Sequence, residues 1–190
     1  MEQQQFPTEE VTLPSKGLLY PEGSPLRKGV ITMKYMTARE EDILTNQNLI
    51  QNGTVIDKLM QSLIVTPIKY DELLIGDKNA ILVAARILGY GKEYTFKFTN
   101  PNTGEEENVT VDLTESKDKE IDESLVTEGK NEFSFTLPTS KIPVTFKFLT
   151  QGDENKINTE LKGLKKLNKK SSNELTTRMK YLLISVNGDY

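Results

Sequence analysis

Carboxylates, lysines and tyrosines are the reactive side chains available here, because the 190 residues include neither His nor Cys. That absence excludes the usual zinc sites, His-based triads and Cys nucleophiles. Acid pairs occur at Glu40–Glu41 and Asp71–Glu72, but neighbouring residues in a helix do not face one another. No glycine-rich phosphate-binding spacing occurs. We therefore predict no catalytic, cofactor-binding or metal-binding residue, and a protein that is not an enzyme.

Two stretches carry strongly uneven charge. Residues 105–132 hold 11 Asp or Glu and three Lys. No calcium-loop spacing occurs there, so we expect an acidic edge in solvent. Residues 156–170 hold six Lys and one Glu. A basic helix can bind nucleic acid or an anionic membrane, but this one lacks Arg and aromatic residues. The net charge of -4 also argues against general nucleic-acid binding. We expect a solvated face, or one that complements an acidic surface on this chain or a partner.

The elements that position these groups centre on the stretch from Gly76 to Gly91. Its residues 80–88 are apolar apart from Arg86, which favours a helix buried nearly all round. The stretch is too short and too charged to span a bilayer. We expect Asp77 to cap its first turn and a glycine to end it. Arg86 should reach solvent or pair with a carboxylate of a flanking helix.

Other helices follow from capping and periodicity. Thr37 and Glu40 fit a capping box, and Asn52–Gly53 ends that helix. The next helix starts at Thr54 and has two rows at i,i+4 spacing: Val55, Leu59, Leu63 and Ile56, Met60, Ile64. Two C-terminal helices are predicted, the second after a capping box at Ser171–Glu174. Their apolar faces are Ile157, Leu161, Leu164, Leu167 and Leu175, Met179, Leu182, Val186.

Alternation with a period of two predicts the strands. Gly29–Met36 is one, with Ile31, Met33 and Tyr35 on its buried side. Two hairpins are predicted, from strands 93–99 with 108–113 and 132–137 with 143–149, and their aromatic face suggests one small antiparallel sheet. The fold class is therefore α+β: an N-terminal extended segment and helical cluster, a small antiparallel β-sheet of two hairpins, and C-terminal helices. We expect regions 1–92, 93–150 and 151–190, with the first and last in one compact unit.

The candidate contact surface is the segment before the first predicted helix. Two prolines hold Val11–Pro21 extended, although the segment is largely apolar. Such a segment near a terminus either packs on its own sheet or docks on a neighbour, and both alternatives stay open. The candidate partner-contact residues are Leu13, Pro14, Ser15, Gly17, Leu18, Leu19, Tyr20 and Pro21.

Three stretches in this order carry a family resemblance. They read L-P-S-K-G-L-L-Y-P at Leu13–Pro21, M-T-A-R-E-E-D-I-L at Met36–Leu44 and L-L-I-G-D-K-N-A-I-L-V-A-A-R-I-L-G-Y-G at Leu73–Gly91. Together with V-D-L at Val111–Leu113, they resemble the baseplate hub subunit and hub assembly proteins of T-even-type contractile-tailed bacteriophages. The resemblance covers residues 11–186, which is nearly the whole chain.

Two departures from that family stand out. Relatives tend to carry C-P-x-C-G at the first hairpin turn, whereas residues 100–104 here read N-P-N-T-G, so we expect the turn but no zinc. Relatives also continue into further helix after the N-G-D segment, so the C-terminal helical part is expected to be shortened or supplied by a partner.

The resemblance implies a non-enzymatic structural or assembly protein of the tail baseplate hub. Its partners would be other hub proteins in a multi-protein complex, with no nucleic acid, membrane, small-molecule substrate or cofactor. It would lie in the virion, or leave before maturation as an assembly chaperone. The N-terminus has no signal-peptide pattern, so we expect the host cytoplasm during assembly. Two alternatives remain: a cytoplasmic adaptor, which would not explain the three motifs, and a carboxylate hydrolase, which needs two acids held close together.

Overall fold

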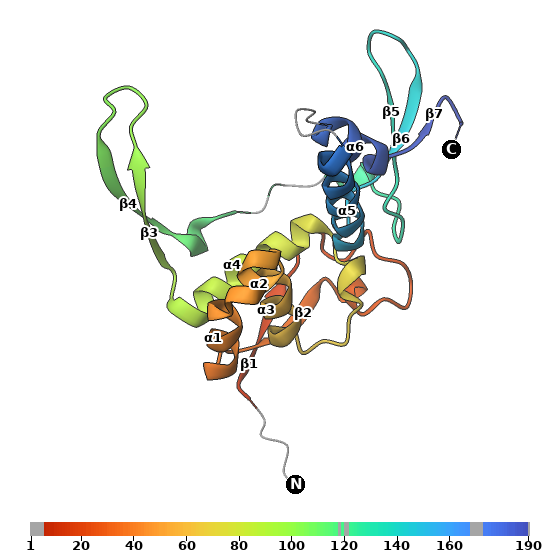
Figure 1. Cartoon of the computed structure of the whole chain (residues 1–190). Coiled ribbons are helices and arrows are strands. Elements are labelled where there is room, and N and C mark those ends of the chain that lie inside the picture. Colours follow the sequence, from red (N-terminus) through yellow and green to blue (C-terminus); the bar gives the residue numbers. More distant parts are fainter. Residues whose placement is uncertain (1–5, 118, 120–121, 168–172, 190) are drawn as a thin grey trace. The chain divides into compact units, whose positions relative to one another are not determined.

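The computed structural model describes residues 6–117, 119, 122–167 and 173–189. It contains helices and small antiparallel sheets, which confirms the α+β class (Figure 1). The chain divides into two compact units, each assembled from stretches far apart in sequence. The first comprises Met1–Val11, Ile31–Val65 and Ala80–Glu120, and the second Thr12–Val30, Thr66–Asn79 and Ile121–Tyr190. The chain passes repeatedly from one unit to the other, and the regions 1–92, 93–150 and 151–190 stay a prediction.

The first unit contains a helical cluster beside a pair of strands. The strands are β1 (Thr8–Thr12) and β2 (Val30–Lys34), and the helices are α1 (Ala38–Thr45), α2 (Gln47–Asn52), α3 (Val55–Leu63) and the later part of α4 (Ile75–Tyr90). The predicted capping box at Thr37 and Glu40 is present at the start of α1. The left-handed Gly53, with φ of 69°, ends α2, as its sequence predicts.

The core of this unit is built by three of its elements. Its buried apolar side chains come from β2, α3 and α4: Ile31, Met33, Leu59, Met60, Leu63, Ile81 and Ala85. The predicted buried side of β2 is confirmed at Ile31 and Met33. The prediction that the central helix is buried nearly all round is wrong: Ile81 is fully buried, but Val83 is 38% exposed. A unit this small covers one stripe of a helix and leaves the rest in solvent.

A buried ion pair ties α1 to β2 and α3. Glu40 is fully buried, and its carboxylate accepts from Lys34 Nζ at 2.8 Å and Ser62 Oγ at 2.6 Å. The Thr37 N–H and hydroxyl donate to its other oxygen. Burial alone would raise the pKa of Glu40. The hydrogen bonds from Lys34, Ser62 and Thr37 outweigh burial and lower this pKa to about 2.

The first predicted hairpin is confirmed and forms a sheet of its own. Strands β3 (Glu93–Thr99) and β4 (Glu106–Asp112) pair antiparallel, with Tyr94 opposite Val111 and Phe96 opposite Val109. α4 ends at Tyr90, and Gly91 follows it with a φ of 83°. Within the part of the chain that the structure describes, Arg86 pairs with no carboxylate of a flanking helix. Its guanidinium donates to the Gly91 and Glu93 carbonyls at 2.9 and 3.3 Å and so stabilises the helix C-terminus.

The second unit combines a three-stranded sheet with two helices. The helices are α5 (Gln151–Leu167) and α6 (Glu174–Leu182), and the antiparallel sheet has the order β5 (Phe133–Thr136), β6 (Pro143–Phe146), β7 (Leu183–Val186). Single 3-10 turns lie at η1 (Pro25–Lys28), η2 (Tyr70–Glu72) and η4 (Glu123–Leu125), while η3 (Leu113–Glu115) follows β4 in the first unit. The apolar core of the second unit includes Leu13, Leu19, Tyr20, Leu26, Leu73, Leu74, Val144 and Ile157.

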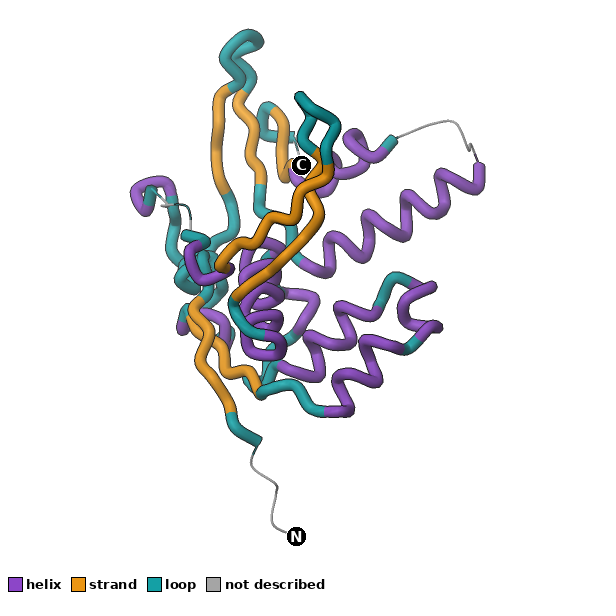
Figure 2. The backbone as a smooth tube through the Cα atoms, turned by 90° about the vertical axis from the view of Figure 1, so that its left-hand side faces the viewer, coloured by secondary structure: helices purple, strands orange, loops and turns teal. Residues whose placement is uncertain are grey.

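Two predictions for this region are wrong. The hairpins do not share a sheet, since β3–β4 and β5–β6–β7 have no strand-to-strand hydrogen bonds in common; Figure 2 draws the strands in orange. The last predicted helix stops at Leu182, and residues 183–186 form β7 beside β6. Residues 183–186 read L-I-S-V and include the β-branched Ile184 and Val186, which favour a strand. Pairing with β6 therefore outweighs the helical spacing of Leu182 and Val186. The second capping box lies partly on residues 171–172, outside the described residues.

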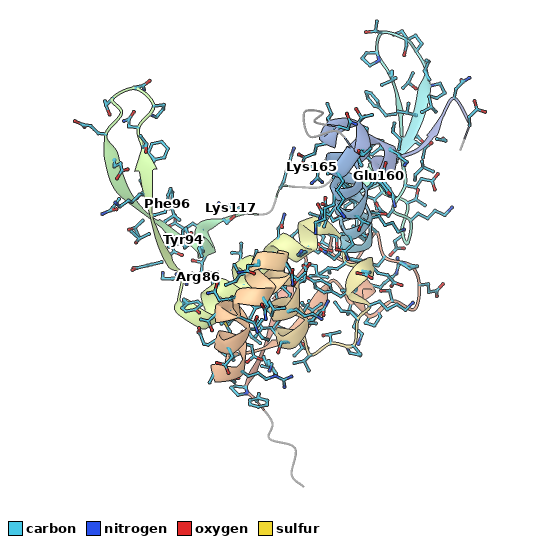
Figure 3. The ribbon with its side chains drawn as sticks, viewed as in Figure 1. Arg86, Tyr94, Phe96, Lys117, Glu160 and Lys165 are labelled. Carbon is cyan, nitrogen blue, oxygen red and sulfur yellow. The ribbon has the colours of Figure 1, made fainter. Side chains whose placement is uncertain are left out.

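The basic helix is α5, whose lysines 156, 162, 165 and 166 are exposed, as predicted for a solvated face. Glu160 and Lys165 lie on it (Figure 3), and Glu160 pairs with Lys180 of α6 at 3.1 Å. Among the described residues, no helix combines the length and apolarity needed to cross a bilayer.

Candidate partner-contact segment and its cavity

The segment from Leu13 to Pro21 is folded into the second unit as a chain of turns. The Leu13 N–H donates to the Gly29 carbonyl at 2.8 Å. Lys16 and Gly17 both have positive φ, of 52° and 77°, which reverses the chain. A Cβ on Gly17 would lie 2.3 Å from the Arg27 carbonyl oxygen. Only glycine fits this position, because it combines a left-handed backbone with backbone contact.

A buried carboxylate from α4 anchors this segment. Asp77 is 1% exposed, and its oxygens accept from the Ser15 N–H at 3.0 Å, the Ser15 hydroxyl at 2.7 Å and the Tyr20 hydroxyl at 2.6 Å. The Tyr20 oxygen in turn accepts from the Leu74 N–H at 3.0 Å. Asp77 was predicted to cap its own helix, and that prediction is wrong: in the first turn of α4 its carboxylate joins two distant stretches of the chain.

The network is suited to holding structure and not to proton transfer. Burial, reinforced by the neighbouring Asp77 carboxylate, raises the pKa of Tyr20 far above its usual value. The Tyr20 hydroxyl therefore stays protonated at physiological pH. The Ser15 side chain is buried, and its hydroxyl donates to Asp77 while accepting from the Gly17 N–H at 3.2 Å. The described arrangement stabilises the segment's turns.

Part of the acidic stretch packs against the same segment. Lys16 pairs with Glu123 at 2.6 Å, and Arg27 with Glu128 at 2.9 Å. The Gly129 N–H donates to the Leu18 carbonyl at 2.7 Å. The expectation of an acidic edge in solvent is therefore incomplete, since these acids pair with bases that lie early in the chain. Exposed pairs stabilise weakly on their own, but the backbone bond adds a fixed contact.

A cavity of about 250 Å³ lies between this segment, the residues around η4 and the sheet. It is lined by Ser15, Leu18, Leu19, Asp122, Leu125, Val126, Phe133, Phe146 and Phe148. The Phe133 ring stacks on Phe146 at 5.6 Å and meets Phe148 edge-on at 5.0 Å between centroids. Leu125 is 69% exposed and Phe148 is 50% exposed, so the apolar lining reaches solvent at its rim.

Comparison with known proteins identifies the family. The model of the T4 bacteriophage base plate protein family matches residues 7–184. The chain belongs to this family. It is a structural protein of a phage tail baseplate and part of a multi-protein complex in the virion. No curated protein and no solved structure matches the chain.

In this base plate protein, the predicted contact residues divide between interior and surface. Leu13, Ser15, Gly17, Leu19 and Tyr20 are buried within the unit. Pro14 and Leu18 are half-buried, and Pro21 is exposed. The structure thus favours intramolecular packing for most of the segment, and it leaves Leu18 half-buried at the cavity and Pro21 exposed.

The acid pairs considered for catalysis are kept apart by their partners. Glu40 is buried in the first unit with Lys34, whereas Glu41 is exposed and accepts from the Tyr90 hydroxyl at 2.7 Å. Asp71 and Glu72 are exposed and bond different partners. Among the described residues, no group of three or more acids is arranged to hold a metal ion. These pairs offer no acid–base couple.

The sequence did not predict that Leu125 and the aromatic residues of the sheet line a cavity beside the segment. The aromatic residues of β5 and β6 were predicted as a sheet face, and their alternation was the available signal. Leu125 lies in a polar stretch whose pattern predicts only a loop. The hydrogen bond from the Gly129 N–H to the Leu18 carbonyl brings this stretch beside the segment.

Proposed function

We propose that this baseplate protein is a non-enzymatic subunit of the hub and acts through protein–protein contacts. The resemblance of residues 13–21, 36–44 and 73–91 to hub subunits supports the location. The observation that carries the mode of action is the apolar cavity beside Leu18, with its solvent-exposed rim at Leu125 and Phe148. Isolated apolar residues on a surface are ordinary, but a concave aromatic-lined group is typical of contact sites.

The cavity has the size of an anchor site. A dry apolar cavity of about 150 Å³ can hold benzene, so a cavity of about 250 Å³ accommodates one large apolar side chain. Anchors of this kind, aromatic or aliphatic and fully desolvated on binding, dominate interface energies. The occupant proposed here is an apolar side chain of a neighbouring hub protein. The Lys16–Glu123 pair near the rim would set its orientation.

A charge placed at the rim tests this proposal. Leu125→Lys changes an exposed side chain, so the effect on folding stability should stay within about 0.5 kcal/mol. A lysine there would put an unpaired charge against the incoming apolar group, which costs several kcal/mol when desolvated. The variant should therefore fold normally and fail to co-sediment with hub intermediates from infected cells.

Val65→Lys is the matched control, because Val65 is a 51% exposed aliphatic residue of the other unit. It should join hub intermediates like the wild type. If Leu125→Lys joins them equally well, the cavity is not a contact site. If the wild type is in the intermediates but missing from finished particles, its role is that of an assembly factor.

A further inference from the structure

The β3–β4 hairpin presents an apolar face that is partly exposed. Tyr94, Phe96 and Phe98 alternate along β3, and Val109 and Val111 lie opposite them on β4. Tyr94, Phe96, Phe98 and Val111 are 37–44% exposed. Figure 3 shows Tyr94 and Phe96 on the hairpin, with Arg86 at its base. We call these five apolar residues the hairpin face.

A two-stranded hairpin with one apolar face is not stable alone in water. Such ribbons need a third strand or a packed helix, and here the reverse face is polar, with Thr95 and Thr110 sharing a hydrogen bond at 2.8 Å. The anchors of this hairpin lie at its base. Lys92 pairs with Asp112 at 2.7 Å, and the Arg86 guanidinium lies 5.6 Å from the Tyr94 ring centroid. Toward the tip, cross-strand contacts such as the Lys97–Glu106 pair at 3.4 Å hold the two strands together.

The size of the hairpin face argues against a second copy as its occupant. Two seven-residue strands present a face of about 23 Å by about 10 Å. Two copies packed face to face would bury about 500 Å² in total, whereas stable interfaces bury about 1,200 Å² or more. The hairpin face needs a partner that surrounds it.

The charge of the hairpin indicates which charge the partner's surface should carry. Residues 92–113 carry five Asp or Glu and two Lys, and Glu105, Glu106 and Glu107 gather at the tip. Glu107 lies opposite Phe98, at the end of the apolar row. A surface that accepts this hairpin should be apolar at its centre and basic where it meets the tip, since unlike charges at an interface rim guide association.

We propose that the β3–β4 hairpin inserts into an apolar cleft, rimmed by Lys or Arg, on another protein of the baseplate. This docking surface is separate from the cavity beside Leu18. It requires membership of the baseplate and does not require the hub location, so it can hold or fail independently of the proposed function.

The lack of native Cys allows a direct test by single-cysteine labelling. Phe98→Cys places a thiol on the hairpin face, and Asn108→Cys places one on the reverse face as the matched control. Each full-length variant is labelled with a maleimide, both as free protein and within isolated baseplates. Labelling at position 98 should be fast in the free protein and fall by about tenfold or more in baseplates, because a covered side chain leaves water. Labelling at position 108 should change less.

Three outcomes would overturn the proposal. Equal labelling at position 98 in free protein and baseplates would mean that nothing covers the hairpin face. Slow labelling in the free monomer would mean that this chain covers it. A concentration-dependent dimer of the free wild type that Phe96→Thr abolishes would make a second copy the occupant. As a second measurement, Glu105→Lys with Glu107→Lys should slow incorporation into baseplates at low salt, and unchanged incorporation would refute the basic rim.

Discussion

Tyr20→Phe tests whether the segment 13–21 is held inside the fold. The Tyr20 hydroxyl donates to the buried Asp77 carboxylate at 2.6 Å and accepts from the Leu74 N–H at 3.0 Å. The substitution removes one of the donors to Asp77 and leaves a buried N–H without that partner. A hydrogen bond to a charged group contributes about 1.5–3 kcal/mol, and an unsatisfied buried donor costs about 1–3 kcal/mol. Allowing for local relaxation, we expect a loss of about 2–4 kcal/mol.

Thermal unfolding followed by circular dichroism measures this loss. A change of 1 kcal/mol shifts Tm by about 2–4 °C for a chain of 150–250 residues, so the variant should melt about 5–15 °C lower. Tyr90→Phe is the control, because Tyr90 is 51% exposed and its hydroxyl bonds the exposed Glu41. It should melt within about 2 °C of the wild type. A Tyr20→Phe shift as small as that of Tyr90→Phe would refute the anchoring role of Asp77.

Three further predictions concern stability. Ile81→Ala should cost about 2–5 kcal/mol because its side chain is fully buried, whereas the exposed Val83→Ala should cost much less; equal losses in urea unfolding would contradict the single buried stripe. Gly17→Ala should destabilise far more than Gly23→Ala, because both have positive φ but only Gly17 has backbone within reach of a new Cβ; matching Tm values would refute the close approach. Glu40 should stabilise the fold fully above about pH 4.5, its ordinary pKa, and this contribution should disappear as the pH falls toward 2, the folded value; a stability gap between wild type and Glu40→Gln that stays constant from pH 6 to pH 2.5 would contradict the lowered pKa.

Local patterns predicted most elements, because their causes are local. The capping box at Thr37 and the period of two in β3 depend on neighbours within a few positions. The membership of each sheet depends on partners far away in sequence. The alternation in β3 and β5 indicated two faces, but it contained no information on whether the two hairpins would meet.

The contacts of the candidate segment could not be predicted from the sequence for the same reason. A carboxylate in the first turn of a helix usually caps that helix, and the sequence of α4 predicts this role for Asp77. Its actual partners, Ser15 and Tyr20, lie 62 and 57 positions earlier. Sequence alone singled out both Ser15 and Tyr20 as contact residues without indicating that their contact is with this chain.

The hub location can be measured directly by quantitative mass spectrometry of hub intermediates, other baseplate intermediates and finished particles from infected cells. We predict that this chain is enriched in the hub intermediates, at a constant ratio to the other hub proteins. Finding the chain only with baseplate parts outside the hub would contradict it.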